Sequence, residues 1–189
     1  DKVTEGLFAP WLISKVDFDR IGGHDHRFKS AREDSDLFNR FLLSGYKMKQ
    51  SWNGFVYHLT ARGGQFEHGV LTKEHSQKSE DWQKLMEAST REYSRKWHSV
   101  VAHDEHMKPI VHPIYDITFV VKNSNKDIIR AVEPWCDKLY VDCSSDEVFS
   151  YINDEKEFTK ENLEDKIKFK EGAPEESDIL VEFDGRNLN

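Results

Sequence analysis

The sequence predicts an α/β protein, and three observations lead to this fold class. In the first half, apolar residues repeat with helical spacing from Leu37 to Leu42, and an alternating apolar pattern follows. In the second half, short apolar runs alternate with amphipathic stretches, which is the order of a parallel βαβ layer. Aromatic residues make up 12% of the 189 residues, whereas disordered chains carry few. We therefore expect a first segment at 1–78, a helix and linker at 79–112, and a small βαβ domain at 113–189.

The first elements are short and are separated by glycine. The apolar run at 7–13 predicts a strand, placed at an edge or after Pro10, because proline cannot donate to a central ladder. The mixed pattern at 16–21 predicts one or two helical turns. Gly22 and Gly23 follow, where a helix end requires a positive φ.

A second helix and a hairpin follow. Ser30 and Glu33 have the spacing of a capping box, and Gly45 stands where the glycine after a helix end belongs. From Tyr46 the apolar period changes to two. The pair Asn53-Gly54 lies between two such runs, and both central positions of a type I′ turn need a positive φ. This segment therefore predicts a β-hairpin.

The remaining chain predicts one long helix and then the βαβ layer. Ser79 is expected to cap a helix that runs to about residue 98. The charged stretch 154–177 gives no clear pattern. The expected strands are 116–121, 139–142 and 179–183, and the expected helices between the first two and after the second are 127–134 and 146–153.

Composition excludes some classes of function. The formal net charge of -8 argues against a protein that coats nucleic acid, because phosphate binding needs a basic surface. No apolar run is long enough to span a bilayer, and we expect neither a membrane span nor a signal peptide. Cys136 and Cys143 are the only cysteines, so we expect a reducing, cytoplasmic location. Both are expected to be buried thiols.

The acidic cluster Arg32-Glu33-Asp34-Ser35-Asp36 has two interpretations. As a helix start it is ordinary, because carboxylates in a first turn are stabilised by the helix dipole by about 0.3–1 kcal/mol each. In the catalytic interpretation, the cluster supplies a carboxylate base at the rim of a cleft. A sugar hydroxyl must lose its proton as it attacks, and a carboxylate within hydrogen-bond reach accepts that proton.

The cluster belongs to a longer succession of motifs. The stretch L-I-S-K-V-D-F-D-R-I-G-G-H-D-H-R-F is followed by R-E-D-S-D-L-F-N-R-F-L-L-S-G-Y and then by F-V-Y-H, which ends at His58. This succession resembles the C-terminal, acceptor-side half of the inverting nucleotide-sugar glycosyltransferases with the GT-A fold. The resemblance covers about Phe8 to His58. It implies a partial GT-A-like (Rossmann-like) layer and transfer of a sugar to a glycan hydroxyl with inversion, as in polysaccharide biosynthesis.

The resemblance also implies roles for single residues. Asp34 matches the general base and Glu33 its acidic partner, which orients the acceptor. A Mg or Mn ion on the donor diphosphate is implied, with His58 as a ligand; the alternative for His58 is a half-buried histidine at a strand end. The residues expected to bind the glycan acceptor are Gly23, His24, Asp25, Asp36 and Trp52, the last by stacking on a sugar ring.

A second hypothesis assigns no chemistry to the chain. The family carries a nucleotide-binding half upstream of these motifs, ending in Asp-x-Asp, and only a short segment precedes them here. The chain is then expected to be a truncated or diverged fragment that binds glycan or a partner subunit. Unpaired strand edges predict self-association as a homo-oligomer.

Two weaker metal hypotheses lie elsewhere. Glu182 and Asp184, at a strand end, either hold a metal-diphosphate or merely end the strand. His103 and His106 bind zinc if they lie on a helix; a polar linker is the alternative.

Overall fold

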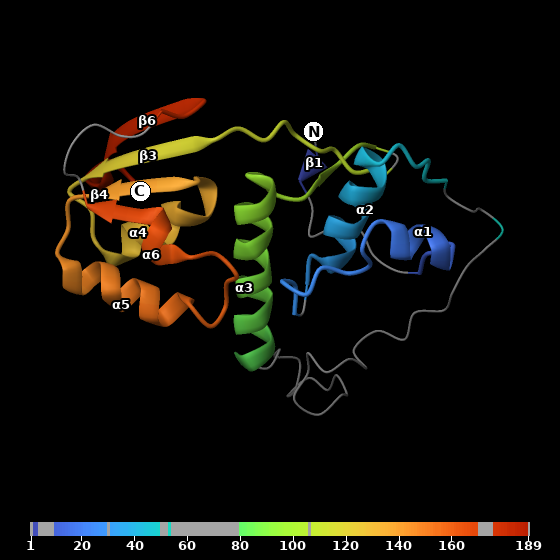
Figure 1. The fold of residues 1–189 in the computed structure, drawn as a ribbon, viewed down its shortest axis with the longest axis horizontal. Helices are drawn as coiled ribbons and strands as arrows, with labels where there is room; N and C mark the ends of the chain where they lie inside the picture. Colours follow the sequence, from blue (N-terminus) through green and yellow to red (C-terminus); the bar gives the residue numbers. More distant parts are fainter. Residues whose placement is uncertain are drawn as a thin grey trace, which may run out of the picture. The chain divides into compact units, whose positions relative to one another are not determined.

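The structure is a computed structural model that describes residues 2–3, 10–29, 31–49, 53, 80–105, 107–169 and 176–188. Its chain forms two compact units. Unit 1 comprises residues 1–90 and 101–111, and unit 2 comprises residues 91–100 and 112–189. Helix α3 (Glu80–Trp97) contributes to both (Figure 1). Each unit is described by itself below. In the described part of the chain, no helix combines the length and the apolar character needed to cross a bilayer.

Two helices of unit 1, α1 (Lys15–Arg20) and α2 (Glu33–Leu43), end in the same way. After α1, the N–H of Gly22 donates to Asp19 O and that of Gly23 to Phe18 O. After α2, the N–H of Gly45 donates to Leu42 O and that of Tyr46 to Phe41 O. This pair of bonds is the Schellman motif. The expected glycine stops are confirmed, because Gly22, Gly23 and Gly45 have φ of 86°, 66° and 80°.

The start of α2 differs from the expectation. The helix begins at Glu33, with Arg32 as its N-cap and no side-chain cap bond, so the predicted capping box from Ser30 is wrong. Ser30 itself lies outside the described residues. Arg32 has φ 73° and ψ -8°, a left-handed conformation that costs a non-glycine residue about 1–2 kcal/mol.

Other strand predictions in unit 1 are also wrong or fall outside the structure. Residues 11–13 and 46–49 have no regular secondary structure, because their backbone groups enter no ladder among the described residues. The Asn53-Gly54 hairpin lies outside the described residues, apart from Asn53. The small sheet of unit 1 pairs β1 (Lys2–Val3) with β2 (Ala102–His103) antiparallel.

Unit 2 is built on a four-stranded parallel sheet, as the alternating pattern predicts. Its strands are β3 (Ile117–Lys122), β4 (Lys138–Val141), β5 (Ile167–Phe169) and β6 (Ile179–Asp184), in the order β5-β4-β3-β6. The βαβ prediction for this region is therefore confirmed. The stretch 154–177 contains two elements that were not predicted, β5 and the one-turn helix α6 (Leu163–Lys166). Both are too short to give a sequence signal.

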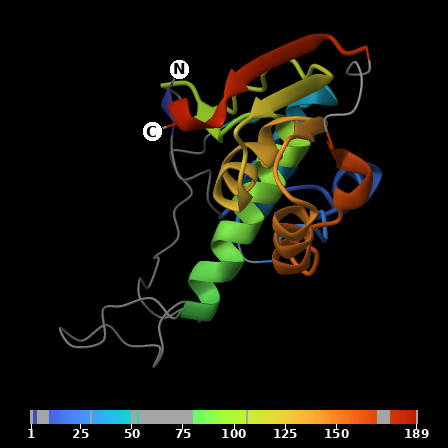
Figure 2. The ribbon, with the colours of Figure 1, turned by 90° about the vertical axis from the view of Figure 1, so that its left-hand side faces the viewer.

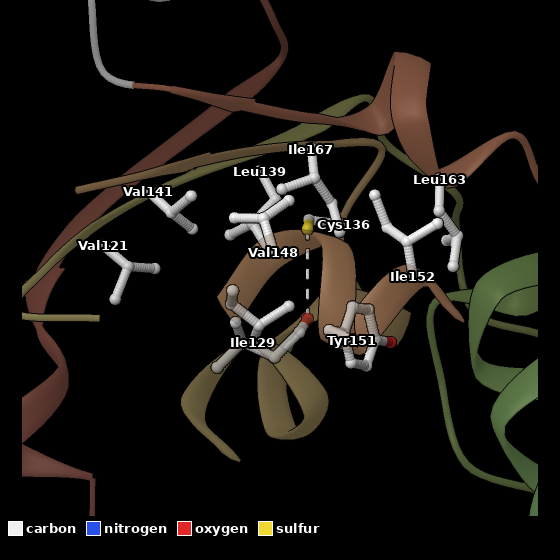
Figure 3. Packing of buried hydrophobic residues seen from close by; sticks show 11 residues of the cluster. Val121, Ile129, Cys136, Leu139, Val141, Val148, Tyr151, Ile152, Leu163 and Ile167 are labelled. Atoms are coloured by element: carbon white, nitrogen blue, oxygen red, sulfur yellow. Dashed lines mark hydrogen bonds between the residues drawn. The ribbon is translucent and has the colours of Figure 1, made fainter. Parts of the chain in front are cut away.

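Two helices pack on one face of this sheet. Helix α4 (Lys126–Val132) continues into a 3-10 turn (Glu133–Trp135) and leads to β4, while α5 (Ser145–Glu155) and α6 lead to β5 (Figure 2). Asn125 and Ser144 cap α4 and α5 with their side chains. The sheet and these helices enclose the apolar core of Figure 3: Val121, Ile129, Val132, Cys136, Leu139, Val141, Val148, Tyr151, Ile152, Leu163 and Ile167.

A buried ionic network ties the last turns of α3 to these helices. The guanidinium of Arg95 is fully buried and contacts Glu92 at 2.8 Å, Glu133 at 2.6 Å and Glu155 at 2.7 Å. Arg91 donates to Glu155 at 2.6 Å, and Lys166 contacts Glu133 at 2.7 Å. Each carboxylate therefore has at least one cationic partner, as buried charges require.

Candidate functional site

The Gly22–Asp25 turn between α1 and α2 has a fixed shape. A Cβ on Gly23 would lie 3.1 Å from Cε1 of Phe18, so the backbone at this point packs directly against the aromatic ring. Combined with its positive φ, this makes Gly23 intolerant of a side chain. The turn therefore exposes backbone where the acceptor contact is expected.

Arg40 holds this turn against α2. Its Nη1 donates to Ile21 O at 2.7 Å and its Nη2 to Gly23 O at 2.6 Å, while its Nε donates to Oδ2 of Asp36 at 2.8 Å. Asp36 is fully buried, and Arg40 is 19% exposed. The expectation that Asp36 binds the acceptor does not fit this position, because its buried carboxylate orients Arg40 instead.

His24 and Asp25 continue the turn. The exposed His24 ring lies 5.8 Å from Trp11 and 5.4 Å from Phe18, measured between ring centroids. Oδ1 of Asp25 accepts the backbone N–H of Arg27 at 3.0 Å, which closes a local turn. Both residues thus lie on the same held turn as Gly23.

Glu33 and Asp34 open α2 and lie in its first turn, where the helix dipole favours negative charge. Oε2 of Glu33 is buried and has no hydrogen-bond partner among the described residues. Buried polar atoms are usually satisfied, so this oxygen is an exception at the start of α2. Just before the pair, Nε of Arg32 donates to Oγ1 of Thr90 on α3 at 3.2 Å.

A groove of about 480 Å³ lies beside the turn, at the C-terminal ends of α1 and α2. We call the hydrogen bonds from Arg40 to Ile21 O and Gly23 O the Arg40 clamp. Both Arg40 and Ile21 also line this groove. None of the residues that line it was a candidate site residue in the sequence: Arg20, Ile21, Arg40, Leu43, Ser44, Gly45 and Tyr46. The one signal for the clamp was the i, i+4 spacing of Asp36 and Arg40, which brings opposite charges together on a helix.

The remaining predicted residues are not brought to this site. Trp52 and His58 lie outside the described residues. Within the described residues, no group of three or more His, Cys, Asp or Glu side chains is placed to hold a metal ion.

The residues of the two weaker metal hypotheses either pair with other side chains or do not lie on the expected helix. Asp184 accepts hydrogen bonds from Arg186 and Asn123, and chiefly the bond from Arg186 lowers its pKa to about 2. Glu182 pairs with Lys122 at 2.6 Å. His103 lies in strand β2 rather than on a helix, so the helical zinc pair is wrong; His106 lies outside the described residues.

The cysteines carry no reactive thiol. Cys136 is buried in the core of unit 2, and burial raises the pKa of its thiol to about 12. Burial also raises the pKa of Cys143. Thiolates are the reactive form, so neither residue suits nucleophilic chemistry at neutral pH.

Comparison of the chain with protein-family models, with curated proteins and with solved structures finds no match. The resemblance to glycosyltransferases therefore rests on the motifs between Phe8 and His58 alone.

Proposed function

We propose that unit 1 carries the acceptor side of an inverting glycosyltransferase that moves a sugar from a nucleotide-sugar to a glycan hydroxyl. The observation that supports it best is the clamp of Arg40. It ties Gly23, the centre of one motif, to α2, whose first turn carries the second motif, Glu33-Asp34. Two motifs that are separated in sequence are thus joined by hydrogen bonds from one arginine of α2.

The chemistry follows from the carboxylates. As the acceptor oxygen attacks the anomeric carbon, the bond from that carbon to the nucleoside diphosphate breaks, and Asp34 takes the hydroxyl proton. Glu33, next to Asp34 in the first turn of α2, orients the acceptor by accepting a second hydroxyl on its carboxylate. A Mg or Mn ion on the diphosphate, for which the resemblance implies His58 as a ligand, would neutralise the departing group.

The fixed turn contributes positioning. Its backbone at Gly23 carries no side chain and is braced by Phe18 on one side and Arg40 on the other. A rigid contact surface of this kind holds the acceptor close to its attack geometry, which lowers the entropy cost of the transition state.

The direct test is Asp34→Asn, with Asp19→Asn on exposed α1 as the matched control. We expect transfer to fall by about 10²–10⁴-fold in the first variant, since the general base is lost, and to be unchanged in the control. Transfer is measured as nucleoside diphosphate released from a panel of UDP- and GDP-sugars with Mn or Mg, on an acceptor glycan panel. Circular dichroism checks that both variants fold.

Unchanged turnover in Asp34→Asn would remove the assignment of the base. Calorimetry separates the enzyme from the non-catalytic alternative: metal-dependent nucleotide binding supports a transferase. Glycan binding without nucleotide binding supports a binding or assembly module.

A further inference from the structure

We propose that the groove at the C-terminal ends of α1 and α2 is a second sugar subsite, which binds a neutral residue of an oligosaccharide acceptor at a distance from the reacting hydroxyl. This inference rests on the proposed function and specifies its acceptor class. It assigns specificity-determining roles to Arg20, Leu43 and Tyr46, which line the groove.

The hydrogen-bonding groups of the groove suit hydroxyls. A guanidinium has five N–H donors, and Arg40 uses three of them on Asp36, Ile21 and Gly23. The Tyr46 hydroxyl donates to Oδ1 of Asp17 at 2.8 Å and accepts from Nη1 of Arg20 at 3.2 Å. The groove thus presents both donors and acceptors in held positions, and a sugar hydroxyl can use either.

The charge of the groove favours a neutral ligand over an anion. Each guanidinium has a carboxylate partner: Arg20 lies 3.5 Å from Asp17, and Arg40 lies 2.8 Å from Asp36. The groove also faces two helix C-termini, which carry partial negative charge. Paired cations between such ends give little net attraction for phosphate or carboxylate, so a polyol is the better match.

Apolar surface completes the match. Leu43 is 63% exposed, and Phe41 braces the Tyr46 ring edge-on at a centroid distance of 5.1 Å. A sugar ring has an apolar face of C–H groups between its hydroxyls. A fixed aromatic ring and an exposed leucine beside hydrogen-bonding groups are the surface against which such a face packs.

Two residues that line the groove lie on the same side of α2 as Glu33. Glu33, Arg40 and Leu43 follow one another at i, i+7 and i+10, so they share one side of α2. Along the helix axis, Glu33 and Leu43 are separated by about 15 Å at a rise of 1.5 Å per residue. A single sugar at Glu33 does not reach Leu43, and a short oligosaccharide along this side does.

The test uses the full chain without donor or metal. Neutral homo-oligosaccharides of glucose, galactose and N-acetylglucosamine, from monosaccharide to pentasaccharide, are titrated by calorimetry and by saturation-transfer NMR. We expect affinity to rise with length in at least one series. Arg20→Gln and Leu43→Ser should each weaken the longer ligands by about tenfold, which is the loss of roughly one good contact, without weakening the monosaccharide.

Both exchanges have matched controls in unit 1. Lys15→Gln and Leu12→Ser change highly exposed residues, 84% and 101% exposed respectively, that do not line the groove. Equal losses in variants and controls would overturn the proposal. So would affinity that does not depend on length, no binding of any neutral series, or stronger binding of inorganic phosphate.

The same experiment separates this proposal from the proposed function. Asp34→Asn should keep the length-dependent binding, because Asp34 does not line the groove. If the chain binds long oligosaccharides but transfers no sugar from any donor, the subsite stands and the transferase assignment fails. If it transfers sugar with no preference for length, the subsite fails and the transferase assignment stands.

Discussion

Different interactions stabilise the interior of unit 1 and the interior of unit 2. Unit 2 has a parallel sheet, two covering helices and one apolar cluster, with a buried ionic network beside it. In the described part of unit 1, short helices are joined by fixed turns, aromatic contacts and the Arg40 clamp. Its buried apolar side chains in that part are Phe28, Leu37, Phe41, Val101 and Ala102.

We therefore expect stability to depend mainly on the interior of unit 2, and the proposed function to depend on unit 1. In unit 2 the buried charges of Arg95, Glu133 and Glu155 pair with one another in the interior, so they are structural. In unit 1 the half-buried Glu33 and Asp34 and the open groove lie beside fixed turns. Binding residues on fixed turns beside a scaffold are a general arrangement in proteins.

The largest effect is expected from Arg95→Met in unit 2. The variant leaves the buried carboxylates of Glu92, Glu133 and Glu155 without their shared cation. We expect a loss of about 3–5 kcal/mol in the free energy of unfolding, measured by urea denaturation. Lys122→Met, which breaks an exposed pair with Glu182, is the control and should cost far less, because solvent screens that pair. Equal costs would contradict the network's structural role.

Leu139→Ala and Leu37→Ala compare the two interiors, since both leucines are fully buried. Each exchange should cost about 2–5 kcal/mol, with Leu139 at the upper end because it lies inside a closely packed cluster that cannot collapse around the cavity. Urea denaturation followed by circular dichroism measures both. A larger cost at Leu37 would mean that unit 1 holds the tighter core.

Acid should weaken unit 2 through Glu133. Burial by itself would raise the pKa of this carboxyl, but the hydrogen bond from Arg95 and the charge of Lys166 lower it from 4.5 to about 2. The folded state binds fewer protons than the unfolded state, so this stabilisation is present above pH 4.5 and is lost as pH falls towards 2. The pKa of Glu155 is lowered in the same way by Arg91.

The measurement is the urea midpoint across this pH range. Glu133→Gln should flatten the dependence, because the titrating group is gone. A wild-type midpoint that stays constant from pH 5 to about pH 2 would show that Glu133 does not contribute.

The smallest effect is expected from Gly45→Ala in unit 1. No atom lies within 4 Å of the added Cβ, so the cost of about 1 kcal/mol comes only from holding alanine at φ 80°. Thermal unfolding measures it, and Ser44→Ala, one residue earlier, serves as the control. A neutral exchange would mean that the end of α2 relaxes without loss.

Local chemistry was enough to predict several parts of the fold. Gly22, Gly23 and Gly45 identified both helix ends, because few other residues adopt a positive φ. Strands β3, β4 and β6 of unit 2 and their parallel arrangement followed from apolar runs such as Ile117–Lys122 that alternate with helical patterns. These features depend on neighbours close in sequence.

Contacts between distant residues decided the rest. Asp36 looked like a member of an acidic surface cluster, and burial against Arg40 and the Gly23 turn made it structural. Glu133 and Glu155 gave no signal in sequence, because their partners Arg91 and Arg95 lie 38 or more positions away, beyond any local pattern. The sequence determined the motifs around Glu33 and Asp34, but only the tertiary structure set the clamp and the groove beside them, since both depend on segments that meet through folding.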